Sequence, residues 1–182
     1  MAATINTREL NGVAPGVAST IASPTGKLIF QMSDSHAEDA SNPILRPVSG
    51  SYYSYWKSIY LNAVTTPPTE INNIKFYSSG TMSWTGVTLY VGDETPDVAN
   101  YVQAVGTLGK TGTEIVTGYS GITAKTTMNT YTSGSPKSVT GSIATPNIGA
   151  ISKLIVLQLT ITGAVDPGDA GSATLTWRYD ES

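Results

Sequence analysis

The only histidine of this 182-residue chain lies in a short acidic segment, SDSHAEDASN (33–42). His36 is close there to Asp34, Glu38 and Asp39, and carboxylates with one imidazole are groups that can bind a divalent cation. Their spacing, however, matches no loop motif of known ligand geometry. We therefore interpret the segment as a solvated acidic loop that requires no metal, and a cation site is the alternative.

A second segment, AVGTLGKTGT (104–113), ends like a phosphate-binding loop at Gly109, Lys110 and Thr111. The motif needs a glycine five residues before Gly109, and this chain has Ala104 there. It also needs a strand before it and a helix after it, and the residue pattern predicts neither. We expect a solvent-exposed loop.

Nucleophilic catalysis has few residues to use. The chain has no cysteine and one histidine, and it contains no G-x-S-x-G motif. A carboxylate pair for glycoside hydrolysis would meet only in the folded chain, and nothing in the sequence indicates one. The sequence therefore predicts no catalytic residues, no cofactor and a protein that is not an enzyme.

Aromatic residues are concentrated in SYYSYW (51–56). Aromatic rings anchor protein interfaces, pack in cores and stack on sugars. Because the segment continues directly into a strand pattern, we expect core or interface roles, with Tyr52, Tyr53 and Tyr55 as interface candidates. A carbohydrate-binding adhesin that uses the Tyr/Trp cluster at 52–56 is the alternative.

Charged residues make up 13% of the chain and the net charge is −3, whereas globular domains average about 25% charged residues. No run of Lys or Arg indicates a nucleic-acid partner. The longest apolar stretch, 151–165, contains Lys153 and Gln158 and is too short to span a membrane. The first residues lack the order of a signal peptide, so we expect synthesis in the cytoplasm. Low charge also favours association with other copies.

Alternating apolar residues predict several short strands and no helix of ordinary length. We expect an all-β, single-domain antiparallel β-sandwich, jelly-roll-like, over residues 26–182. The last strand, 173–180, should pair with 151–162, since sequential strands are usually neighbours. The predicted core consists of Ile59, Leu61, Ile74, Phe76, Leu89, Ile155, Leu157, Leu159, Leu175, Trp177 and Tyr179.

Residues 1–25 show no sustained period. They are expected to form an extended N-terminal arm, or alternatively a disordered tail. The arm would bury four aliphatic residues on a neighbouring subunit, namely Leu10, Val13, Val17 and Ile21. Its deletion is then expected to leave the domain folded.

Two stretches, 53–80 and 151–182, together resemble small β-sandwich structural proteins of tailed bacteriophages. The matching residues are Trp56, Lys57 and Ile59; Ile71, Asn73, Ile74 and Phe76; Pro167 and Gly168; and Trp177, Tyr179, Asp180 and Glu181. The resemblance leaves out 1–25 and 106–150 and brings no functional site with it. It implies a virion location and partners that are other copies of the chain and other virion proteins of the capsid or neck. A capsid decoration or auxiliary head protein is the first expectation, and a neck, tail or fibre component is the second.

Overall fold

The computed structural model describes residues 2–21, 26–165 and 172–182. These residues form two large antiparallel sheets and one two-stranded hairpin. The larger, eight-stranded sheet has the order β2-β1-β4-β13-β6-β9, with β12 also pairing with β4 and β3 with β13. Its strands are β1 (Ile5–Asn11), β2 (Val17–Ile21), β3 (Ser51–Tyr53), β4 (Lys57–Ala63), β6 (Val87–Gly92), β9 (Lys125–Thr127), β12 (Gly149–Ala150) and β13 (Ile155–Thr162).

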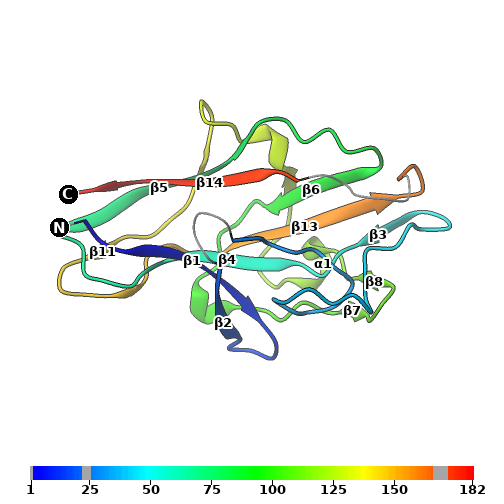
Figure 1. The fold of residues 1–182 in the computed structure, drawn as a ribbon, viewed down its shortest axis with the longest axis horizontal. Helices are drawn as coiled ribbons and strands as arrows, with labels where there is room; N and C mark the ends of the chain where they lie inside the picture. The colour runs from blue at the N-terminus through cyan, green and yellow to red at the C-terminus, as the bar shows by residue number, and fades with distance from the viewer. Residues whose placement is uncertain (1, 22–25, 166–171) are drawn as a thin grey trace.

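The smaller, four-stranded sheet is built on β5, which lies beside β14 (Figure 1). On its other side β5 pairs with β10 and β11. Its strands are β5 (Glu70–Ser79), β10 (Lys137–Ser138), β11 (Ile143–Ala144) and β14 (Thr174–Glu181). Three one-turn helices and a separate hairpin complete the described chain: η1 (Val98–Asn100), α1 (Ile115–Gly118), η2 (Met128–Thr130), β7 (Gly106–Thr107) and β8 (Thr111–Gly112). The all-β sandwich is confirmed.

The main core lies between the two sheets, where the apolar rows of their strands meet. Of the predicted core residues, those in β4, β5, β6 and β13 are buried, with at most 7% of their surface exposed. Leu175, Trp177 and Tyr179 of β14 are partly buried and pack against this core. The rings of Phe76 and Trp177 lie 4.6 Å apart between centroids, a tilted contact of the kind aromatic pairs favour.

The opposite face of the larger sheet is also covered. Trp56, Ile115, Tyr119 and Val156 belong to a second buried cluster on this face. Gln158 of β13 is fully buried there, accepts a hydrogen bond from Ile115 N–H (2.9 Å) and donates to the carbonyls of Ser54 (2.8 Å) and Thr113 (2.7 Å). These bonds satisfy a side chain that would otherwise be costly to bury.

The expected N-terminal arm is wrong for the residues that the structure describes. β1 pairs with β4 over residues 5–10 and with β2 over residues 7–11, so the segment is a hairpin of the larger sheet. Its turn uses Gly12 (φ 77°) and Gly16 (φ 83°), and a Cβ on Gly16 would lie 2.8 Å from the Tyr101 ring. The alternation was obscured because the inward-facing side of β1 carries a carboxylate, Glu9, rather than an aliphatic residue.

The aliphatic residues of the hairpin have different environments. Leu10 is buried (6% exposed) in the second cluster and Ile21 packs against the main core, so neither is free for a neighbouring subunit. Val13 and Val17 are 78% and 67% exposed and remain interface candidates. Residues 22–25 lie outside the described part of the chain.

The expected pairing of the last strand with 151–162 is also wrong. β14 pairs with β5 in the smaller sheet, with Trp177 opposite Phe76. β13 is already flanked by β4 and β3 on one side and by β6 on the other, so both of its edges are used. The alternation identified a strand but carried no information about its partner.

Candidate functional site

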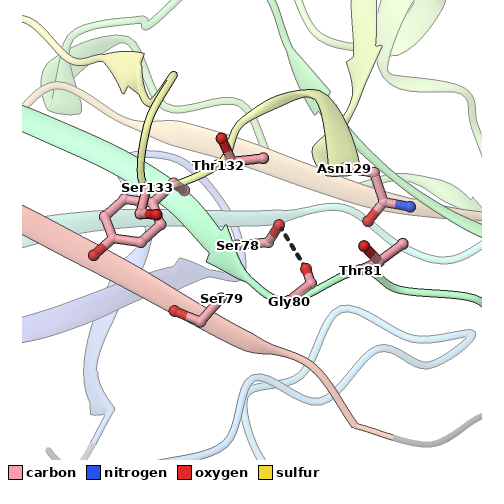
Figure 2. Close-up of a pocket in the computed structure, with 8 residues that line it drawn as sticks. Ser78, Ser79, Gly80, Thr81, Asn129, Thr132 and Ser133 are labelled. Carbon is pink, nitrogen blue, oxygen red and sulfur yellow. Dashed lines mark hydrogen bonds between the residues drawn. The ribbon is translucent and has the colours of Figure 1, made fainter.

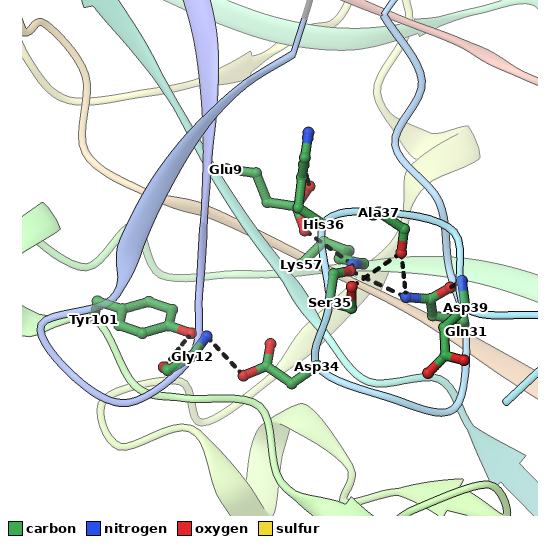
Figure 3. A network of polar contacts seen from close by, with 10 residues as sticks. All are labelled: Glu9, Gly12, Gln31, Asp34, Ser35, His36, Ala37, Asp39, Lys57 and Tyr101. Carbon is green, nitrogen blue, oxygen red and sulfur yellow. Dashed lines mark hydrogen bonds and ion pairs between the residues drawn. The ribbon is translucent and has the colours of Figure 1, made fainter. Parts of the chain in front are cut away.

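A buried ion pair lies inside the sandwich, near one end of the larger sheet. Lys57 Nζ of β4 is 2.9 Å from Glu9 Oε1 of β1, and the two side chains are 2% and 0% exposed. His36 Nδ1 lies 2.7 Å from the other carboxylate oxygen of Glu9, and Lys57 also donates to the carbonyl of Ser35. Figure 3 shows this pair beside the acidic segment, which contributes His36 and the Ser35 carbonyl to these contacts.

The acidic segment is ordered around a second buried side chain, Gln31. Its amide nitrogen donates to the carbonyls of Ser35 (3.1 Å) and Ala37 (2.9 Å), and its amide oxygen accepts from the Asp39 N–H (2.8 Å). Gln31 is 2% exposed. The Gln31 side chain therefore holds the backbone of the segment that was expected to be a solvated loop. The Glu38 side chain remains exposed.

Asp34 connects this segment to two other parts of the chain. Its Oδ2 accepts from the Gly12 N–H (2.9 Å) in the hairpin turn and from Gln103 Nε2 (3.1 Å). Tyr101 donates its hydroxyl to the Gly12 carbonyl (3.1 Å). Burial raises the pKa of Asp34, and the hydrogen bonds from Gly12 and Gln103 oppose that shift. Burial, together with nearby Asp34, also raises the pKa of Tyr101.

Asp39 has the opposite environment although it lies in the same segment. Hydrogen bonds from Asn42 Nδ2 (2.7 Å) and Ser33 Oγ (2.8 Å) lower the pKa of its carboxyl. These donors stabilise the charged form.

The acidic side chains do not converge on a common point. Asp34 faces Gly12, Asp39 faces Ser33 and Asn42, and His36 faces Glu9. Among the residues described, no group of three or more His, Cys, Asp or Glu side chains is placed to hold a metal ion. The charges of Glu9 and Lys57 pair with each other. This arrangement holds the acidic segment and the hairpin against the sheet.

Lys57 and Glu9 were not singled out from the sequence. The sequence does indicate that Lys57 is buried. It falls in the same alternating row as Ile59 and Leu61 and therefore lies on the core-facing side of its strand. A charged residue at such a position needs a buried partner. Nothing in the sequence identified Glu9 as that partner, because the two residues are 48 positions apart.

The segment that ends like a phosphate loop forms the β7–β8 hairpin. The Gly109 N–H donates to the Met32 carbonyl (2.9 Å), so it is not free to bind an anion. Leu108 and Lys110 are exposed while Ala104 is buried. The helix that follows has only four residues.

The aromatic cluster at 52–56 is mostly buried. Tyr55 and Trp56 are 6% and 2% exposed, and Trp56 Nε1 donates to the Val102 carbonyl (3.1 Å). Tyr55 is therefore not an interface residue, because packing within the chain already covers it. Tyr52 and Tyr53 are half-buried, and Lys125 Nζ lies 5.1 Å from the centre of the Tyr53 ring.

An open hollow of about 370 Å³ lies at the end of β5, lined by hydroxyl and amide groups (Figure 2). Several of its polar groups bond within the protein. Asn129 donates to the Met82 carbonyl and accepts from the Met82 N–H, and Ser79 bonds Thr176 at 2.9 Å. These bonds stabilise the end of the strand.

Comparison with known proteins gives no relative: no family model, curated protein or solved structure matches the chain. The fold defines the class of protein, an all-β sandwich in a single domain. Across the described residues, no helix has the length and apolar character needed to cross a membrane.

Proposed function

We propose that this protein is a structural component of a virion, a capsid decoration or auxiliary head protein that binds the particle and associates with copies of itself. It acts through its surfaces, and the buried polar network serves to hold those surfaces in place. Its location is the virion after synthesis in the host cytoplasm.

The observation that carries this proposal is the contact between two of the motifs by which the chain resembles phage structural proteins. The Ile-x-Asn-Ile-x-Phe motif lies in β5 and the terminal Trp-x-Tyr-Asp-Glu motif lies in β14, and these two strands pair with each other. Trp177 packs on Phe76, and Asn73 Nδ2 donates to Asp180 Oδ2 (2.8 Å). The two motifs, about 100 positions apart in the sequence, thus contact each other in the fold. Such contact is expected if both motifs specify the same β-sandwich. Pro167 and Gly168 lie outside the described residues.

The competing adhesin function has less support in the structure. Its sugar platform would need exposed aromatic faces at 52–56, but Tyr55 and Trp56 are buried. Lys125 lies over the rings of both Tyr53 and Tyr90, 5.1 Å and 4.3 Å from their centres. A sugar that stacked on the ring faces beneath Lys125 would have to displace this lysine.

Cosedimentation with separated capsids and tails tests the proposal. Tagged chain is mixed with each fraction of the particle and run through a density gradient, with untagged chain as competitor. We expect saturable binding to capsids that the untagged chain displaces. Binding to tails alone would support the neck, tail or fibre alternative. Binding to neither, with glycan binding that Tyr53→Ala abolishes, would support the adhesin.

A further inference from the structure

Strand β2 forms an open edge of the eight-stranded sheet. It pairs with β1 on one side only, and no other strand among the described residues pairs with it (Figure 1). In an edge strand, alternate residues direct their N–H and C=O groups away from the sheet, where they can pair with another strand.

The chemistry of β2 does nothing to block such pairing. Its five residues, Val17-Ala18-Ser19-Thr20-Ile21, include no charge and no proline. Its register against β1 runs from Val17 to Ile21 without a shift. Val17, Ala18 and Thr20 are exposed.

Two other edge strands, β14 and β9, have features that usually prevent strand addition. β14 carries Arg178, Asp180 and Glu181, and its register shifts between Arg178 and Asp180. β9, at the far edge of the larger sheet, has three residues and includes Lys125. Short length, charge and bulges all disfavour edge-to-edge pairing, so β2 is less protected against strand addition than β14 or β9.

We propose that β2 pairs antiparallel with β2 of a second copy of this chain about a two-fold axis, which joins two of the larger sheets into one. This inference rests on the self-association that is part of the proposed function, and it names the surface. A two-fold axis makes an interface from the same patch on both subunits.

The residues of β2 suit a partner with the same sequence. With the axis at Ser19, each Val17 lies opposite Ile21 of the partner subunit, and each Ala18 lies opposite Thr20 of the partner subunit. Val17, Ser19 and Ile21 share one face of the sheet, because they pair with Asn11, Glu9 and Thr7 of β1. The pairing therefore covers Val17, now 67% exposed, with an aliphatic neighbour and brings no like charges together.

Light scattering during size exclusion tests the interface. The wild type should elute with the mass of a dimer. Ala18→Lys combined with Thr20→Lys places like charges opposite each other across the axis and should halve the mass. The matched control is Ser172→Lys combined with Thr174→Lys, which adds the same charges at the same spacing in and beside β14 and should remain dimeric. Circular dichroism should show an unchanged β spectrum in both.

A cysteine variant tests the register, because the native chain has no cysteine. Ser19→Cys should form an intermolecular disulfide on mild oxidation, and Thr174→Cys should not. A monomeric wild type, a dimer that survives the two β2 lysines, or the absence of the Ser19→Cys disulfide would each overturn the inference. Particle binding by a monomeric wild type would leave the virion assignment standing while removing this interface.

Discussion

Replacing Lys57 with methionine should strongly destabilise the fold. Methionine keeps most of the volume of the lysine stem but removes the ammonium group that lies 2.9 Å from Glu9. The carboxylate, at 0% exposure, would then stay buried with only His36 beside it. Removing one partner of a buried ion pair costs about 3–5 kcal/mol. We expect the free energy of unfolding to fall by about 3 kcal/mol, since the His36 contact remains.

The chain offers a matched control for this change. Lys153 Nζ lies 3.3 Å from Asp97, with side chains 35% and 57% exposed, and exposed pairs contribute only about 0–1 kcal/mol. Urea unfolding of Lys57→Met and Lys153→Met should therefore differ by about 2 kcal/mol or more. Adding Glu9→Gln to Lys57→Met removes the isolated charge, so the double variant should lose less than the sum of the single losses. Equal losses for the two lysines, or simple additivity with Glu9→Gln, would refute the view that the pair is buried and coupled.

Four further outcomes are expected. Trp177→Ala should cost about 3 kcal/mol in denaturant melts, near the low end for large core residues because Trp177 is partly exposed, and Thr176→Ala should cost less than half of that. The pKa of Asp34 is raised in the folded protein, so its contribution to stability is present below its usual pKa of 3.8 and is lost as the pH rises through the folded pKa. The stability of Asp34→Asn should therefore rise relative to that of the wild type as the pH goes from acid to neutral. The pKa of Asp39 is lowered, so its contribution to stability is present above pH 3.8 and is lost as the pH falls through the folded pKa. Asp39→Asn should be less stable than the wild type at neutral pH and approach the wild-type stability in acid. Parallel pH profiles of stability for the two variants would contradict these assignments. Deleting residues 1–25 should abolish soluble folding, because it removes β1 and leaves Lys57 buried without Glu9; a folded product with an unchanged β spectrum would restore the arm interpretation.

The strands that the sequence identified correctly are those with an aliphatic row on one side. β4, β5, β6 and β13 show this row, and the predicted core residues in them are buried. β1 lacks it because Glu9 occupies a core-facing position. Alternation also does not specify which strands pair, and so β14 was assigned to the wrong sheet.

The buried polar network could be anticipated only in part. The acidic segment was noticed because its residues are close in sequence. Its real partners are Glu9 in β1, Lys57 in β4 and Gln103, which are distant along the chain and meet only after the sheet and its covering loops form. The second cluster was missed for a related reason: Gln158 lies in the polar row of β13 and gave no sign that residues 113–122 would cover it.

Electron cryomicroscopy of particles saturated with the chain tests the virion assignment most directly. We expect density for the sandwich on the capsid, repeated at symmetry-related positions, with β2 edges of neighbouring copies in contact. If particles saturated with the native chain show no added density anywhere, the virion assignment is contradicted.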